Sequence, residues 1–262
     1  MNKRTAQALI LTALLPALGA AVENDAKGIM AQSQEAMKLD GSESVVTLTI
    51  SDQRGNTRVR TFSSASKKYP DGSTKMIMRF LEPADVRGTG ILTFDNVKGD
   101  DDMWIYMPAL RKTRRIVSTE KTKSFMGSEF SNADITTPNI DDYTYTVIGN
   151  ETLDGLDCWK IETVPANDGI AAETGYSKKI VWIAKNDYMA RKTEFYDRSG
   201  KHLKTLDVHE VQLLDEKNRK YLARDITMVN VQNNRKSRFK IDKVVFNPGV
   251  SDEYFTVRYL EK

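Results

Sequence analysis

The stretch STKMIMRFL, residues 73–81, decides how this chain is predicted to fold. Met76, Met78 and Phe80 recur at every second position, and the charged Arg79 falls between them. Because successive side chains of a β-strand point to opposite faces, this alternation puts the three apolar residues on one face. The stretch therefore predicts a strand with one buried face.

The same alternation recurs through most of the chain, between turn signals such as Asp71-Gly72, Asp154-Gly155 and Ser199-Gly200. Evenly spaced short strands joined by tight turns are typical of antiparallel pairing between consecutive strands. About ten to twelve strands exceed what an open flat sheet holds without curling, so we expect a mainly β fold with one strongly curved antiparallel sheet, a barrel or partial barrel. The candidate strands cover residues 44–50, 57–66, 73–81, 88–97, 103–107, 143–150, 157–164, 178–184, 191–197, 203–213, 221–230, 237–246 and, with a weaker pattern, 257–260.

The N-terminus has the three parts of a secretory signal peptide. Lys3 and Arg4 precede an apolar run at residues 6–15, and small residues cluster at 19–21. An amphipathic surface helix is the alternative, but the segment shows no charged face. We therefore expect residues 1–21 to be a signal peptide and residues 22–262 to form a single domain. The mature chain is expected in the periplasm.

Composition argues against several classes of function. Loss of Lys3 and Arg4 lowers the formal charge from +3 to +1, which gives no reason to expect nucleic acid. Cys158 is the only cysteine, and we expect a buried, inert thiol. His202 and His209, the only histidines, lack metal-ligand spacing, and no catalytic motif is present. We expect no enzyme, cofactor or metal.

One acidic triplet and one acidic pair leave other interpretations open. Residues 100–102 are three consecutive aspartates that could bind calcium, but they lie at an expected hairpin tip and lack the distal glutamate of a calcium loop. Asp141 and Asp142 could suggest a glycosidase. Adjacent side chains on a strand point to opposite faces, which argues against that function.

The apolar faces of the strands are the positive indication of function. Only residues 21–39, which have helical character, and the region 124–140 could cover the concave side of the sheet, so an apolar pocket is expected there. Met-rich walls suit ligands of variable shape, although strand methionines are more often core. The expected lining is Val46, Leu48, Ile50, Met76, Met78, Phe80, Met103, Ile105 and Met107. A register shift of one residue would replace the last strand's contribution with Trp104 and Tyr106.

A basic cluster, RKTRR at residues 111–115, follows a turn that begins at Pro108. The four cations Arg111, Lys112, Arg114 and Arg115 could contact anionic lipid headgroups or an acidic partner. The alternative is a solvated hairpin edge, where charges prevent unwanted strand pairing. The sequence leaves both interpretations open.

Three blocks together resemble a known family. MRFLEPADVRGTGILT (78–93), MWIYMPALRKTRRI (103–116) and SFMGSEFSNADI (124–135) are similar to LolA-like periplasmic outer-membrane lipoprotein-sorting proteins, in the branch found with RND-type (MMPL-like) exporters. The resemblance implies a LolA/LolB-like unclosed half β-barrel of about eleven strands, with a few helices over the concave side.

The same resemblance implies a function. A monomeric carrier would hold lipid or lipoprotein acyl chains, touch membranes transiently, and work with an RND/MMPL-type exporter. An exporter adaptor that carries no cargo is the alternative. A hydrolase of envelope lipids is a third class, and it lacks a nucleophile–base pair.

The last of the three blocks contains apolar residues in a loop-like context. Phe125, Met126 and Phe130 have little use in a solvated loop. We expect them to fold over the cavity edge as a lid, with Gly127 giving the backbone freedom to turn. A fixed plug that completes the core is the alternative.

Overall fold

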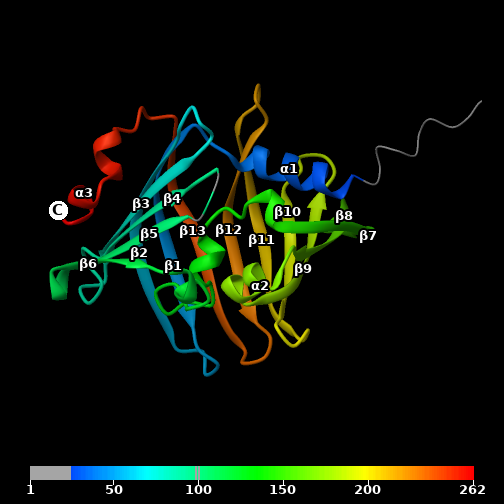
Figure 1. Ribbon diagram of the computed structural model, residues 1–262, viewed down its shortest axis with the longest axis horizontal. Helices are drawn as coiled ribbons and strands as arrows, with labels where there is room; N and C mark the ends of the chain where they lie inside the picture. The colour runs from blue at the N-terminus through cyan, green and yellow to red at the C-terminus, as the bar shows by residue number, and fades with distance from the viewer. Residues whose placement is uncertain (1–24, 98, 100) are drawn as a thin grey trace, which may run out of the picture.

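One antiparallel sheet of 13 strands runs through the part of the chain that the computed structural model describes, residues 25–97, 99 and 101–262 (Figure 1). The predicted curved antiparallel sheet is confirmed, with 13 strands where about eleven were expected. The expected signal peptide, residues 1–21, and Asp100 of the acidic triplet lie outside the described residues. The strands are β1 (Gly41–Ser51), β2 (Thr57–Lys68), β3 (Thr74–Glu82), β4 (Gly90–Asp95), β5 (Asp102–Met107), β6 (Lys112–Ile116), β7 (Tyr143–Leu153), β8 (Leu156–Pro165), β9 (Tyr176–Ala184), β10 (Ala190–Asp197), β11 (His202–Asp215), β12 (Lys220–Asn230) and β13 (Arg235–Phe246).

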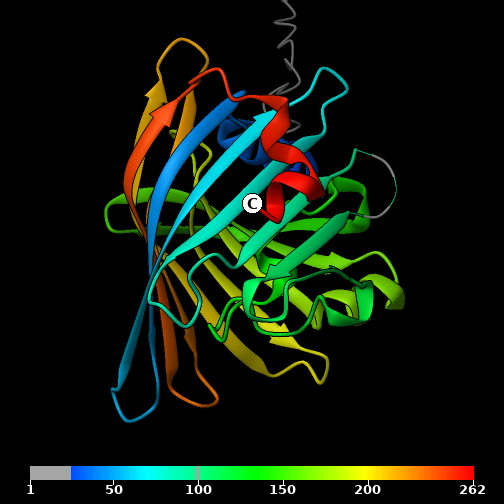
Figure 2. The same cartoon turned by 90° about the vertical axis from the view of Figure 1, so that its left-hand side faces the viewer.

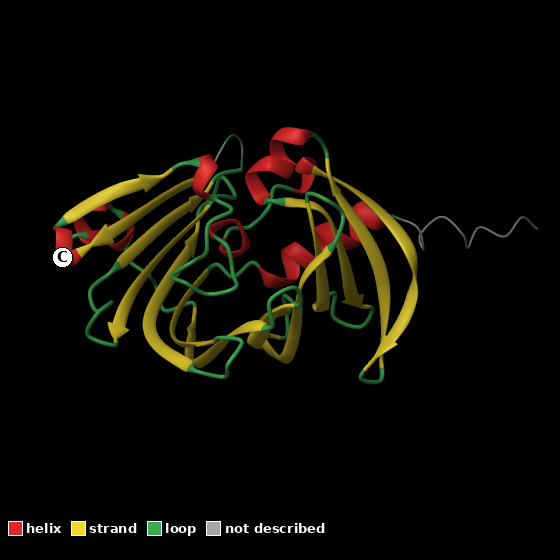
Figure 3. Cartoon of the chain, turned by 90° about the horizontal axis from the view of Figure 1, so that it is seen from below, coloured by secondary structure: helices red, strands yellow, loops and turns green. Residues whose placement is uncertain are grey.

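The strand order explains why the barrel stays open. Consecutive strands pair with each other, and the two ends of the sequence meet where β1 pairs with β13. This arrangement leaves β6 and β7 as the two unpaired edges. Residues 117–142 connect these edges and lie on the concave side, where Figure 3 shows loops and short helices enclosed by the strands. Residues 117–142 therefore span the gap between the two edge strands on the concave side of the sheet.

Three elements differ from the expectations. Residues 112–116 form the edge strand β6, although their charges gave no alternating apolar signal. Residues 257–260 form a helix, α3 (Val257–Leu260), and not a strand, because the Thr256 side chain accepts a hydrogen bond from the Tyr259 N–H and starts a helical turn. A short helix, α2 (Asp168–Thr174), follows β8 and begins with the N-cap Asn167.

Helices cover both faces of the sheet. On the concave side, α1 (Ala26–Met37) packs Ala26 and Ile29 against β8 and β9. On the outer side, residues 250–260 lie over β2–β4 (Figure 2) and bury Phe255 and Leu260. We call residues 250–260 the C-terminal cover. A side chain at Gly90 would meet Leu260 at 2.6 Å, so this glycine is needed for the close contact.

Candidate functional site

The largest apolar cluster lies on the concave face, where the predicted lining residues come together. Leu48 and Phe80 are fully buried, and their neighbours on β1, β3, β4 and β5 alternate with outward-facing residues. Met76 and Ile105 are partly buried and pack against the same cluster. The predicted lining residues that are buried in this cluster are Val46, Leu48, Ile50, Met78, Phe80 and Met103.

The remaining lining candidates come from β5 and lie elsewhere. Trp104 and Tyr106 belong to the cluster on the outer face, together with the C-terminal cover. The register places Ile105 opposite Ile91, so Ile105 and not Trp104 points to the concave side. Met107 is partly buried at the end of β5 and belongs to neither cluster.

Residues 124–131 form a small hairpin on the concave side, which we call the Phe hairpin. Ser124 and Ser131 form an isolated antiparallel bridge, and the Phe125 N–H donates to the Phe130 carbonyl at 2.7 Å. Gly127, with a φ of 76°, makes the turn that the sequence suggested at this position.

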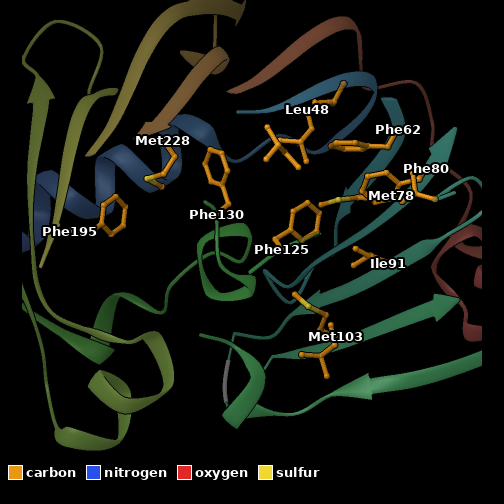
Figure 4. Packing of buried hydrophobic residues seen from close by; sticks show 14 of the residues in the cluster. Leu48, Phe62, Met78, Phe80, Ile91, Met103, Phe125, Phe130, Phe195 and Met228 are labelled. Carbon is orange, nitrogen blue, oxygen red and sulfur yellow. The ribbon is translucent and has the colours of Figure 1, made fainter. Parts of the chain in front are cut away.

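The two aromatic side chains of the Phe hairpin fill the concave face. Phe125 is 1% exposed and Phe130 is 3% exposed. Their rings approach Phe239 of β13 at centroid distances of 6.1 and 4.5 Å, and Phe125 lies 6.4 Å from Phe80. Figure 4 shows both side chains inside the cluster of strand residues. Met126 packs at the margin. The chain's own phenylalanines therefore occupy the apolar surface of the sheet.

Polar contacts hold the backbone of the Phe hairpin to the strands. Arg60 donates to the Met126 carbonyl, and Arg235 donates to the Gly127 carbonyl at 3.2 Å. The Glu129 N–H donates to the Ser237 hydroxyl at 3.0 Å. Burial lowers the pKa of the Arg60 guanidinium, which has no ion pair within the described residues. These contacts, two of which have charged donors, fix the backbone of the hairpin to the strands.

A buried ion pair anchors the end of the Phe hairpin. Asp134 accepts hydrogen bonds from Lys204 at 2.6 Å, the Tyr176 hydroxyl at 2.9 Å and the Ser131 N–H at 2.7 Å. Burial alone would raise the pKa of Asp134, but the charges of Lys204 and Lys179 hold it below its ordinary value. Both members of the pair are about 5% exposed or less. A pair this deeply buried depends on every one of these contacts.

Sequence reasoning missed these polar residues. Lys179 and Lys204 occupy concave-facing positions of β9 and β11, where alternation would call for apolar side chains. The sequence signal for these residues was a charged side chain at a position where the alternation predicts an apolar one. Lys204 contacts Asp134 directly, and Lys179 acts on Asp134 through its charge. This arrangement of residues far apart in sequence depends on the curvature of the sheet and cannot be read from a single strand.

The basic cluster lies on the open edge strand β6. Arg114 pairs with Glu120 at 2.7 Å, and Arg115 pairs with Asp102. Arg111, which has a left-handed backbone with a φ of 47°, and Lys112 are exposed and form no ion pair among the described residues. Two of the four cations are thus neutralised locally, and two remain accessible.

Other candidate chemistry is limited in the described part of the chain. Cys158 is buried, as predicted, and burial raises the pKa of its thiol. In residues 25–97, 99 and 101–262, no group of three or more His, Cys, Asp or Glu side chains is arranged to hold a metal ion. None of the helices described there is both long and apolar enough to cross a membrane.

Solved structures share this architecture. An outer membrane lipoprotein-sorting protein domain, so described, from Vibrio parahaemolyticus is 27% identical, with a TM-score of 0.83 over 90% of this chain and 98% of that chain. A family model described as "-like: Uncharacterized protein" matches residues 72–262, more than half of the sequence, and the chain belongs to that family. Its fold is the LolA-like open barrel.

Two further structures extend the relationship. A DUF1329 family protein from Desulfovibrio piger is 28% identical to this chain, with a TM-score of 0.83 over 90% of this chain and 97% of that chain. A LolA superfamily protein from Nitrosomonas europaea, 22% identical, shares the fold with a TM-score of 0.68 over 89% and 98% of the two chains. No curated protein matches the sequence.

Proposed function

We propose that this LolA-like protein is a periplasmic carrier that binds lipid, or the acyl chains of a lipoprotein, on its concave face. The observation that carries the proposal is the pair Phe125 and Phe130, which occupy an apolar surface made by the strands. The related Vibrio domain is described as a lipoprotein-sorting protein. A signal peptide at residues 1–21 and a single carrier domain at 22–262 belong to this proposal.

Binding works by exchange between the Phe hairpin and an acyl chain. Each CH2 of an acyl chain costs about 0.8 kcal/mol to expose to water, so unaided release from a membrane is negligible. The hairpin leaves the cluster as the acyl chain enters, and one apolar group replaces another. The cost of opening is then mainly the loss of polar contacts such as Arg60 with Met126 and Arg235 with Gly127. The lining residues Val46, Leu48, Ile50, Met76, Met78, Phe80, Met103 and Ile105 would contact the cargo.

The carrier shuttles its cargo between the inner and outer membranes, with an RND-type exporter as the partner at the inner membrane. The exposed cations Arg111 and Lys112, beside the open edge, suit a brief contact with anionic headgroups or with an acidic exporter surface. Release follows when a site of higher affinity receives the chain.

Lipid uptake by the purified protein tests the proposal. Native mass spectrometry and displacement of a fluorescent fatty acid are expected to show bound lipid in the wild type. Phe125→Ala with Phe130→Ala is expected to speed exchange. Phe255→Ala removes an equally buried ring from the outer face and serves as the matched control. A protein that neither copurifies with lipid nor takes up the probe would overturn the carrier proposal.

An adaptor that docks on an exporter without cargo is the second candidate. It is favoured by two exposed cations that form no ion pair among the described residues, Arg111 just before β6 and Lys112 at its start. Charge reversal at Arg111 and Lys112 is the sharper test, because Arg114 and Arg115 are held by Glu120 and Asp102. Loss of partner capture with unchanged lipid uptake would favour the adaptor. Loss of lipid transfer alone would favour the carrier.

A further inference from the structure

Lys179 lies where the apolar cluster of the concave face ends. It is opposite Phe195 of β10 and Thr163 of β8, and it points to the concave side. Its ammonium lies over the rings of Tyr176 and Phe195, at 5.2 and 5.3 Å from their centroids, and 5.7 Å from that of Tyr143. Tyr176 and Phe195 are members of the same cluster as the Phe hairpin. A chain bound in that cluster would therefore end beside Lys179.

The charge of Lys179 is not neutralised by a direct ion pair. Asp134, the carboxylate that acts on it most strongly, already accepts hydrogen bonds from Lys204, Tyr176 and Ser131. In the part of the chain that the structure describes, Lys179 forms no ion pair. Burial lowers its pKa, while Asp134 opposes that shift. A half-buried cation without a direct anionic partner is costly, and such groups gather at binding sites.

A cavity of about 230 Å³ adjoins Lys179. Lys179, Tyr143 and Thr174 line part of it, and the carboxylates of Asp101 and Asp142 line another part. The remaining charges of the wall, Lys121 and Glu173, form an ion pair with each other. The cavity thus offers the ammonium of Lys179 next to the apolar cluster and the carboxylate of Asp101 on its wall.

We propose that this cavity binds the headgroup of the cargo and selects a zwitterionic headgroup that contains a phosphate and a primary amine. The phosphate contacts Lys179, next to the apolar cluster, and the ammonium contacts Asp101. This inference rests on the proposed carrier function and adds the chemical class of its ligand. A purely anionic headgroup would meet the Asp101 carboxylate without an ammonium to offset its charge, and an uncharged one would leave Lys179 without an ion pair.

Competition among lipids with identical acyl chains tests the selection. The purified protein is loaded from mixtures of phosphatidylethanolamine, phosphatidylglycerol and diacylglycerol, and the bound species are counted by native mass spectrometry. The wild type is expected to prefer phosphatidylethanolamine at least several-fold over both competitors. Lys179→Gln is expected to remove the preference over diacylglycerol. Asp101→Asn is expected to raise the share of phosphatidylglycerol.

Lys178→Gln is the matched control, because Lys178 is the neighbouring lysine on the outer face and pairs with Glu162. It is expected to leave the selection unchanged. Equal uptake of the three lipids by the wild type, or an unchanged preference in Lys179→Gln, would overturn the headgroup site while leaving the carrier function intact. Absence of any bound lipid would contradict the carrier itself. If Lys179→Gln does not fold, the wild-type selection and the Asp101→Asn shift still decide the question.

Discussion

The sheet is covered by apolar side chains on both faces, but the two covers are attached in different ways. The C-terminal cover inserts Leu260 against Gly90 and shares a cluster with Leu92 and Ile77. The Phe hairpin also buries its rings, yet its backbone is held by isolated polar contacts such as Arg60 with Met126. The outer cover completes the fold by close packing. The proposed carrier function requires that a ligand of similar apolarity can replace the Phe hairpin on the concave face.

Removal of a ring from the outer cover is expected to have the largest effect on stability. Phe255 is 3% exposed, and Phe255→Ala should lower the free energy of unfolding by about 3–5 kcal/mol, because the cavity left behind cannot collapse easily. Chemical denaturation measures the loss. Saturation with lipid should leave the size of that loss unchanged, and a loss that disappears in lipid would show that this cover also exchanges.

Loss of the buried ion pair between Asp134 and Lys204 should have the second-largest effect on stability. Lys204→Met leaves Asp134 without its closest cation and is expected to cost about 3 kcal/mol or more. Denaturation of the single variant and of Lys204→Met with Asp134→Asn measures the coupling. The double variant should recover part of the loss. An additive result would contradict the role of this pair as the anchor of the Phe hairpin.

Truncation inside the Phe hairpin should cost less than truncation of the outer cover. Phe125 is as buried as Phe255, but the loss of stability is limited by the free energy at which the hairpin opens, about 1–3 kcal/mol. The distinguishing measurement is denaturation with and without saturating lipid. Phe125→Ala should destabilise the lipid-free protein and leave the loaded protein unchanged. The same loss in both states would identify a fixed plug.

The contact between residues 117–142 and the sheet and the contact of the C-terminal cover should respond to pH in opposite directions. Burial and the charge of Asp101 raise the pKa of Asp95, which accepts from the Thr137 N–H in residues 117–142, to about 6. Its contribution to stability therefore falls as pH rises from about 4 through 6, on the order of 1–2 kcal/mol. On the outer cover, hydrogen bonds from Lys67 and Tyr69 lower the pKa of Asp252, so its contribution is lost as pH falls below the ordinary range.

Asp95→Asn tests the concave half of this contrast. The variant should lose the part of the pH dependence between pH 4 and 6 and gain stability at pH 7. Thermal unfolding at several pH values measures it, and Asp252→Asn is the control on the other face. A wild-type stability that rises steadily between pH 4 and 6, with no change in Asp95→Asn, would rule out this role for Asp95.

Loss of a single hydrogen bond to the Phe hairpin should have the smallest effect. Arg60→Lys keeps the charge but alters the donor geometry toward the Met126 carbonyl, and it is expected to cost about 0.5–1.5 kcal/mol. Fluorescent fatty acid should enter and leave this variant faster than the wild type. Arg58→Lys, which changes a neighbouring exposed arginine, is the control. Unchanged exchange would show that Arg60 does not hold the hairpin closed.

Alternation alone was enough to predict the sheet and much of the concave face. The period of two is a local property of each strand, so Val46, Leu48, Phe80 and Met103 could be assigned to one face before their partners were known. The sequence left two registers open only for β5. The pairing of β5 with β4 shows that Ile105, and not Trp104, faces the concave side. The apolar residues of the Phe hairpin were also visible as an anomaly in a loop.

Features that depend on contacts between distant strands could not be predicted. The edge strand β6 has no apolar face of its own and forms by pairing with β5. The C-terminal helix is a single turn fixed by the cap at Thr256. Lys179, Lys204 and Asp134 meet because the curved sheet brings β9 and β11 under the loop between its edges. No local pattern specifies that meeting.

Hydrogen exchange at the Glu129 amide tests most directly whether bound cargo displaces the Phe hairpin from the sheet. This N–H donates to the Ser237 hydroxyl of β13, so its protection reports contact between the Phe hairpin and the sheet. The Leu260 N–H, bonded to the Thr256 carbonyl at 3.0 Å in the C-terminal cover, is the internal reference. We expect bound lipid to speed exchange at the Glu129 amide and to leave exchange at the Leu260 amide unchanged. A Glu129 amide that is equally or better protected in the lipid-bound protein would contradict displacement of the hairpin by the cargo.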